Sequence, residues 1–161
     1  MKRIVGISII AAVLTVVLAF VVGQAVSQEE GADTMQILRE KIRTDKKLLV
    51  SVNMQLTQDE ADVFWPVYDT YQGALQDLLD RSIKLIDDYS QHYGDMSDES
   101  AARMIDDYLA IEADRQNLRE AYLPLFVNAL PYKKVFRYYQ IENKIHAVVN
   151  YELARAIPLA E

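Results

Sequence analysis

The stretch Leu56–Tyr68, LTQDEADVFWPVY, decides the fold, because it starts a helix and returns in altered form as Leu130–Glu142, LPYKKVFRYYQIE. Thr57 and Glu60 form the pattern T-x-x-E, in which the threonine side chain caps a helix and the glutamate reaches back to the threonine amide. In the second copy Pro131 stands in place of the threonine, and proline suits a helix start because its nitrogen needs no partner there. Both copies are therefore predicted to begin helices.

The two copies align at an offset of 74 residues, and what they share is a leucine before the cap and an aromatic pair after it. The paired positions are Leu56 with Leu130, Phe64 with Tyr138, and Trp65 with Tyr139. Alternate helices of an antiparallel arrangement start at the same end, so we expect these side chains to meet there in one shared core.

Apolar residues recur at alternating steps of three and four residues on both sides of the first copy, as on one face of a helix. The pattern predicts a helix from about Met35 to Met54, a helix of about 35 residues after Thr57, and further helices after Ser97 and Pro131. Glycine is scarce, and the Asn-Gly and Asp-Gly turns of β-hairpins are absent from the sequence. An all-α fold follows.

Two residues are expected to shape the long helix. Pro66 removes one backbone hydrogen bond and should bend the helix near Trp65, and Gly94 should end it in a left-handed conformation. The helix after Ser97 then runs back beside it. The apolar stripe of that helix is predicted to hold Met104, Tyr108, Ile111, Arg115, Leu118, Tyr122, Leu125 and Ala129. The fold class is an elongated four-helix chain with a long bent antiparallel helical hairpin.

The N-terminus carries an export signal. Lys2 and Arg3 precede an uncharged apolar run, and small residues at Ala25 and Ser27 fit a signal-peptidase site. Residues 1–27 are therefore predicted to be a signal peptide cleaved near Ser27 or Ala25, followed by a linker over 28–34 and a helical domain over 35–161. The run over residues 4–22 is also close to the length that spans a bilayer, so a retained inner-membrane anchor is the alternative.

Charge and cysteine content exclude several classes of function. The chain has no cysteine, which excludes disulfides, thiolate metal sites and cysteine nucleophiles. Residues 57–129 hold sixteen acids and five bases, whereas residues 130–161 hold five bases and three acids. A chain that is acidic as a whole is unsuited to general phosphate-backbone binding, which needs clustered Lys and Arg to displace counterions. Nucleic acid is therefore not an expected partner, and the basic end should be attracted to the acidic middle.

Candidate sites are few. With two histidines, no Ser-His-Asp order and no glycine-rich loop, the sequence predicts neither an enzyme nor a cofactor. Asp88 and His92 lie one helical turn apart and are a weak candidate for a divalent-metal site, with a solvated acidic turn as the other interpretation. The basic run Lys133, Lys134 and Arg137 is a candidate partner-binding patch, or else a complement to the acidic hairpin.

These residues resemble the Spy/CpxP-like family of bacterial periplasmic proteins, whose hallmark is a Leu-Thr-x-x-Gln motif repeated at two helix starts. The resemblance covers roughly residues 35–161. Glu60 stands where the motif has Gln, and the second copy keeps only Leu130. The resemblance implies a periplasmic homodimer shaped as a cradle. It also implies a role as an ATP-independent chaperone, an envelope-stress adaptor that modulates a sensor kinase, or a zinc-responsive resistance protein.

The leading hypothesis is an exported, non-enzymatic protein that binds unfolding clients or an envelope sensor. One alternative is a periplasmic metal-binding sensor or resistance protein on the same fold. The other alternative is a membrane-anchored structural coiled coil, in which the membrane becomes a partner because the N-terminal segment stays uncleaved.

Overall fold

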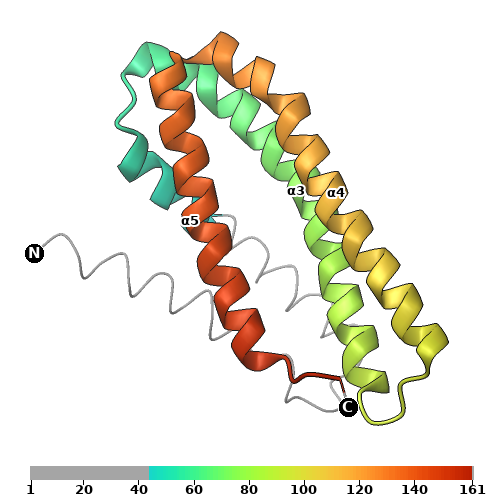
Figure 1. The fold of residues 1–161 in the computed structure, drawn as a ribbon. Helices are drawn as coiled ribbons and strands as arrows, with labels where there is room; N and C mark the ends of the chain where they lie inside the picture. The colour runs from blue at the N-terminus through green and yellow to red at the C-terminus, as the bar shows by residue number, and fades with distance from the viewer. Residues whose placement is uncertain (1–43, 161) are drawn as a thin grey trace, which may run out of the picture. The chain divides into compact units, whose positions relative to one another are not determined.

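The computed structural model describes residues 44–160, and every regular element in that range is a helix (Figure 1). The prediction of an all-α fold is confirmed. No helix in this range is long and apolar enough to cross a membrane. The predicted signal peptide or anchor, the linker and the start of the first helix at Met35 lie outside the described residues.

The helix boundaries follow the capping signals in the sequence. A helix over residues 44–54 is followed by α3 (Gln58–His92), α4 (Asp98–Ala129) and α5 (Tyr132–Ala156). Thr57 is the N-cap of α3, and Ser97, whose hydroxyl accepts a hydrogen bond from the Ser100 amide, is the N-cap of α4. The 35 residues of α3 confirm the long helix that was predicted after Thr57.

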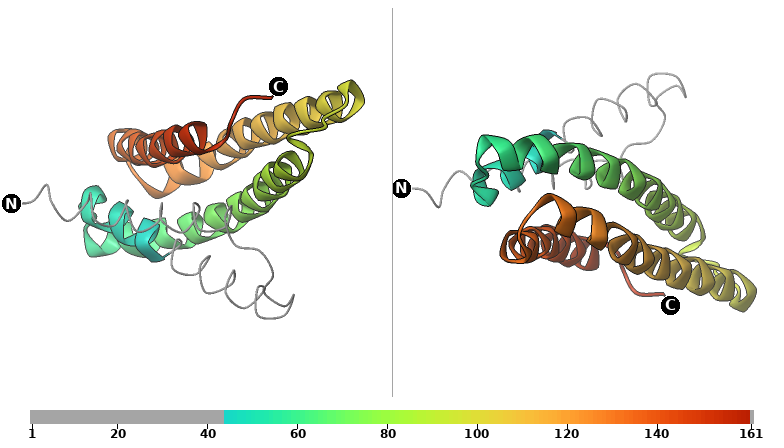
Figure 2. Two further views of the ribbon diagram at one scale, coloured as in Figure 1. Left: turned by 90° about the horizontal axis from the view of Figure 1, so that it is seen from below. Right: turned by 90° about the horizontal axis from the view of Figure 1, so that it is seen from above.

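The described chain forms two compact units, of which the larger, Leu56–Val135, contains the helical hairpin. Within it α3 and α4 run antiparallel and side by side (Figures 1 and 2). Aromatic rings dominate their contact: Phe126 of α4 lies 5.9 Å from Phe64 and 5.6 Å from Tyr71, measured between ring centroids. The buried residues of the hairpin helices are Phe64, Tyr68, Tyr71, Leu78, Ile111 and Phe126.

The predicted stripe of α4 is wrong at two positions. Leu125 was placed on the inward face but is 46 % exposed, and its neighbour Phe126 is fully buried instead. Tyr108 was also placed inward and is 56 % exposed. A strict repeat of 3.5 residues drifts by about 20° per heptad around a straight helix. By the last turns of α4 that drift has moved the inward position from residue 125 to residue 126.

Two expectations concerned the ends and the curvature of the long helix. α3 continues without a break through Pro66, whose carbonyl accepts a hydrogen bond from the Thr70 hydroxyl at 2.9 Å, and its ribbon is bowed in Figure 2.

The prediction for Gly94 is wrong, because no glycine in the described residues has a positive φ. The left-handed residue is Gln55, at φ 52°, directly after the helix over 44–54.

The smaller unit joins the helix over residues 44–54 to α5, through Phe136–Pro158. Val50, Met54 and Tyr138 are its buried hydrophobic residues. An ion pair at 2.8 Å links Lys46 to Glu142, whose side chains are only 20 % and 12 % exposed. The pair links the two helices, and removing either partner would leave a largely buried charge unpaired.

Candidate functional site

The first copy of the repeated motif forms the predicted capping box. The Thr57 amide donates to Glu60 Oε2 at 2.8 Å, and the Glu60 amide donates to Thr57 Oγ1 at 3.4 Å. The Thr57 hydroxyl also donates to the same carboxylate oxygen at 3.2 Å. Two amides that the helix itself leaves without partners are thereby satisfied at the start of α3.

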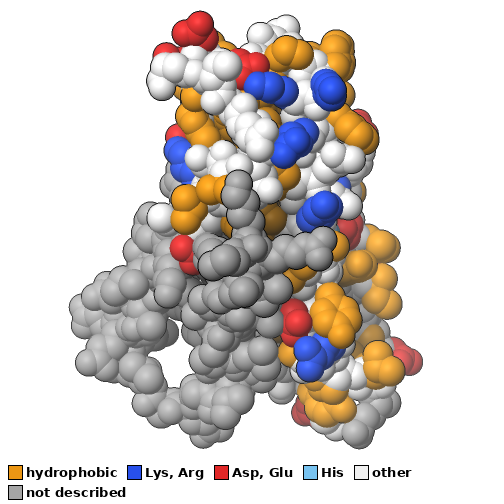
Figure 3. Space-filling view, turned by 90° about the vertical axis from the view of Figure 1, so that its left-hand side faces the viewer, with side chains coloured by type: hydrophobic (Ala, Val, Ile, Leu, Met, Phe, Trp, Pro, Cys, Tyr) orange, Lys and Arg blue, Asp and Glu red, His pale blue; other side chains and the backbone are white. Residues whose placement is uncertain are grey.

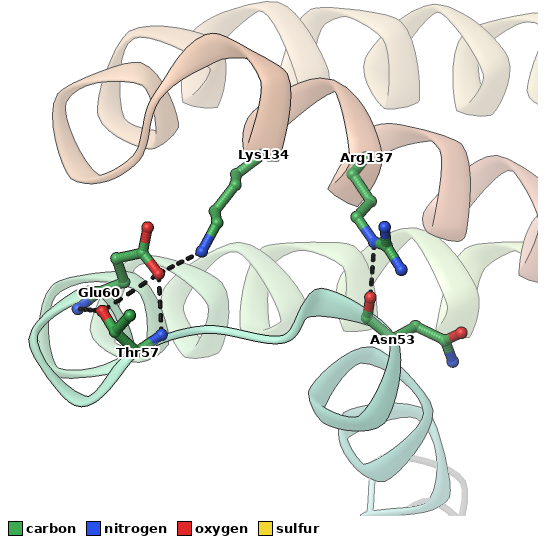
Figure 4. A network of polar contacts seen from close by, with 5 residues as sticks. All are labelled: Asn53, Thr57, Glu60, Lys134 and Arg137. Carbon is green, nitrogen blue, oxygen red and sulfur yellow. Dashed lines mark hydrogen bonds and ion pairs between the residues drawn. The ribbon is translucent and has the colours of Figure 1, made fainter.

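Lys134, in the first turn of α5, completes this arrangement by forming an ion pair with Glu60 Oε2 (Figure 4). The two residues are 74 positions apart, which is the offset between the motif copies, so the pair joins equivalent positions of the repeat. The last position of the Leu-Thr-x-x-Gln pattern is a neutral glutamine. In this chain the first copy has the acid Glu60 there, and the second copy has the base Lys134. The two departures from the pattern are therefore complementary.

The electrostatics of the pair follow from these contacts. The hydrogen bond from Lys134 Nζ, and after it the one from the Thr57 amide, hold the pKa of the Glu60 carboxyl below its ordinary value. Each contact favours the charged form of the carboxylate. Near neutral pH the Glu60 carboxylate is therefore negatively charged. Its charge stabilises the N-terminus of α3 and pairs with Lys134 of α5.

In the second copy the start of α5 is held by backbone hydrogen bonds and not by a side-chain cap. The Pro131 carbonyl accepts hydrogen bonds from the amides of Lys134 at 2.8 Å and Val135 at 3.1 Å. Leu130, extended at φ −139°, ends α4 by donating its amide to the Phe126 carbonyl. Leu130 and Val135 are each 3 % exposed. Leu130 and Val135 thus belong to the core, whereas Leu56 of the first copy is half-buried.

The aromatic residues of the motif also serve packing. Phe64 is fully buried, Tyr138 is 1 % exposed, and Trp65 and Tyr139 are half-buried. Trp65 packs edge to face against Phe64 at 5.0 Å within its own helix, as Tyr138 and Tyr139 do at 5.9 Å within theirs. The meeting of the two aromatic pairs with each other stays a prediction.

The three residues of the basic run have different surroundings. Lys134 is engaged by Glu60, which agrees with the expected attraction between the basic end and the acidic middle. The Arg137 Nε donates to the Asn53 carbonyl at 2.6 Å, so this arginine helps to end the helix over residues 44–54 (Figure 4). Lys133 is exposed. Their role in binding a partner stays a prediction.

Asp88 and His92 are adjacent, but the contact between them is structural. The His92 Nδ1 donates to the backbone carbonyl of Asp88 at 2.8 Å, as at the end of many helices. Among residues 44–160, no group of three or more His, Asp or Glu side chains is arranged to hold a metal ion. This pair can therefore supply at most two ligands from the described part of the chain.

Sequence reasoning missed a surface on α4, which we call the α4 patch: Ile105, Tyr108 and Leu109. Their side chains are 58 %, 56 % and 57 % exposed, and spacings of three and four residues place them on one face of the helix. The signal that marks this surface is an apolar residue outside the inward stripe, as at Ile105 and Leu109. Large apolar side chains that gather on a surface often mark an interaction site.

Comparison of the chain with family models, with curated proteins and with solved structures found no match in any of the three.

Proposed function

We propose that this chain is an exported, non-enzymatic protein-binding protein of the Spy/CpxP type, acting as an ATP-independent chaperone on unfolding clients or as an envelope-stress adaptor. The observation that carries the proposal is the α4 patch. Three large apolar side chains, each more than half exposed, stand together on α4 beside the face that packs against α3. A partner that covers them removes apolar surface from water, which favours association.

The surroundings of the α4 patch define the chemistry of a suitable partner. Asp106 adjoins Ile105 in the chain, and Glu112 lies one turn beyond Tyr108 on the same helix; both acids are exposed. An apolar patch with an acidic rim favours segments that combine apolar residues with Lys or Arg. Unfolding proteins expose such segments in many sequences, which suits a chaperone that does not select one client.

Other features support this reading over the metal-sensor alternative. The described residues offer no three-ligand cluster, and the Asp88–His92 pair is held by a backbone hydrogen bond. The α4 patch, in contrast, leaves three large apolar side chains more than half exposed on one helix. Protein binding is therefore the function that the geometry favours.

The test is suppression of aggregation of a chemically denatured client, followed by light scattering without ATP. The parent protein is compared with a variant carrying Ile105→Ser and Leu109→Ser. Because both side chains are exposed, the variant should keep its fold, which far-UV circular dichroism checks. The matched control carries Val52→Ser and Val63→Ser, which replace aliphatic residues that are 67 % and 50 % exposed on other helices.

The proposal expects the parent and the control to suppress scattering at near-equimolar ratio and the α4 patch variant to fail. If the parent suppresses nothing while remaining folded, the chaperone role is wrong. If the variant with serine at both α4 positions is as active as the parent, the binding surface lies elsewhere.

A further inference from the structure

The exposed residues of α5 fall on one half of the helix. α5 is continuous from Tyr132 to Ala156, so the direction of each side chain around its axis follows from its number at about 100° per residue. On this scale every exposed residue up to Arg155 lies within an arc of about 140°, and all the half-buried and buried residues lie outside it. We call this arc the outer face of α5.

The outer face is basic and aromatic. Its members are Tyr132, Lys133, Phe136, Arg137, Gln140, Asn143, Lys144, Ala147, Asn150, Tyr151, Ala154 and Arg155. Three of them are aromatic residues that are 76 %, 65 % and 62 % exposed in chain order. Four are basic, three are amides, and none is acidic. Figure 3 shows blue Lys and Arg side chains among orange hydrophobic ones on the side of the molecule that it draws.

The two acids within α5 lie outside this face and are already paired. The Glu142 side chain is 12 % exposed and pairs with Lys46 at 2.8 Å. The Glu152 side chain is 19 % exposed and pairs with Arg155 at 3.2 Å. Arg155 in turn lies over the Tyr151 ring, 5.8 Å from its centroid, with most of its side chain in solvent. Arg155 is thus compensated by Glu152, whereas Lys133, Arg137 and Lys144 form no ion pair within residues 44–160.

The distribution of large side chains distinguishes the kind of partner that fits. Protein interfaces concentrate their anchors near the centre of the contact, but the centre of this face holds Gln140, Asn143 and Ala147. Its aromatic side chains lie toward the two ends of the helix, at Tyr132 and Phe136 and at Tyr151. A lipid surface needs no central cluster, because each aromatic ring enters the headgroup region by itself. Basic residues then pair with anionic headgroups along the whole length of the helix.

We propose that the outer face of α5 binds an anionic phospholipid surface. The helix lies flat on the membrane, with its aromatic rings among the headgroups and Lys133 and Lys144 at the phosphates. This contact is distinct from protein binding at the α4 patch, and it requires no membrane-spanning segment. If the proposed function holds, this contact places a protein-binding protein at the membrane surface.

Vesicle flotation tests the proposal. The protein is isolated after export by the expressing cells and mixed with phosphatidylcholine vesicles that either contain or lack phosphatidylglycerol. Binding is expected only with phosphatidylglycerol, and it should weaken when salt rises from about 0.05 M to about 0.5 M. A retained N-terminal segment would also favour anionic lipid through Lys2 and Arg3, so the contribution of α5 is isolated by variants within α5.

Charge-reversal variants locate the contact. Lys133→Glu with Lys144→Glu should lower binding by about tenfold or more, since each basic residue near an anionic surface strengthens binding severalfold. In the range 44–160 neither lysine forms a salt bridge, so the fold should persist. The control, Lys84→Glu with Arg103→Glu, changes the net charge equally on α3 and α4. It breaks the Arg103–Glu99 pair, but both side chains are well exposed, so the loss of stability should be small. This control should bind nearly as well as the parent.

Several results would overturn the proposal. One is absence of binding to anionic vesicles at low salt; another is an equal loss in the control, which would show a general charge effect. A third is that the protein ignores vesicles but binds an acidic polypeptide such as polyglutamate through Lys133 and Lys144. The outer face would then bind an acidic protein and not a membrane.

Discussion

Replacing Phe126 with alanine tests the packing of the hairpin most sharply, because its neighbour Leu125 provides a matched control. Phe126 is fully buried, and its ring lies 5.9, 5.6 and 6.5 Å from those of Phe64, Tyr71 and Tyr122. Removing a buried phenylalanine costs about 3–5 kcal/mol, through lost burial and the cavity left behind. Leu125 is 46 % exposed, so alanine there should cost about 1 kcal/mol or less.

The assay is urea unfolding followed by far-UV circular dichroism, with the free energy of unfolding extrapolated to water. Domains of this size are stable by only about 5–15 kcal/mol, so Phe126→Ala is expected to reduce the native fraction strongly. Phe126→Leu then provides a milder probe, with an expected loss of about 1–3 kcal/mol. The reasoning is refuted if Leu125→Ala destabilises the protein as much as either substitution at position 126, since residue 125 would then be the inward one.

Four further changes probe the helix starts and ends, each measured by the same unfolding experiment. Thr57→Ala should cost about 1 kcal/mol through the lost cap, and an unchanged midpoint would argue against a capping role. Leu130→Ala should cost about 2–4 kcal/mol because the side chain is 3 % exposed; a loss below about 0.5 kcal/mol would show that the repeated leucine is not a core residue. Gln55→Gly should stabilise the protein by about 0.5 kcal/mol, since glycine adopts a φ of 52° without strain, and destabilisation would contradict that account. The folded pKa of Glu60 lies below its unfolded value, so its contribution is present above the unfolded pKa and is lost as pH falls through the folded one. Glu60→Gln should therefore destabilise the protein at pH 7 and have less effect at about pH 3; an equal effect at both pH values would count against a charged Glu60–Lys134 pair.

The sequence predicted the helices because their starts carry explicit chemistry. The T-x-x-E pattern at Thr57, the serine at Ser97 and the proline at Pro131 each answer the need of a helix start for satisfied or absent amides. Those signals are local, so they can be read without knowing what packs against the helix. The first residues of α3, α4 and α5, which are Gln58, Asp98 and Tyr132, each directly follow one of these signals.

Exposure could not be read with the same accuracy, because it depends on neighbours distant in the chain. A periodic stripe gives the direction of the core only while the assumed repeat equals the real one, and the difference placed Leu125 inward in error. The α4 patch was missed for a related reason. Ile105 and Leu109 lie outside the inward stripe and Tyr108 lies on it, so their common exposure could not be read from the periodicity alone.

Gln55 and the Glu60–Lys134 pair show two further limits. Glycine is the residue most often found in a left-handed conformation, so the sequence favoured Gly94, yet the conformation occurs at Gln55. In the sequence, Glu60 and Lys134 appeared only as two separate substitutions of the glutamine in the Leu-Thr-x-x-Gln pattern. Only the geometry shows that they neutralise each other.

The central claim, that the α4 patch holds a non-native client, is tested most directly by site-specific photocrosslinking. A photoreactive residue is placed at Leu109 and, as a control, at Asn117, which is also exposed on α4 about two turns further along. Each protein is irradiated with an unfolding client. The account predicts crosslinks from position 109 and few from position 117. Equal crosslinking from the two positions, or crosslinking from position 117 alone, would contradict it.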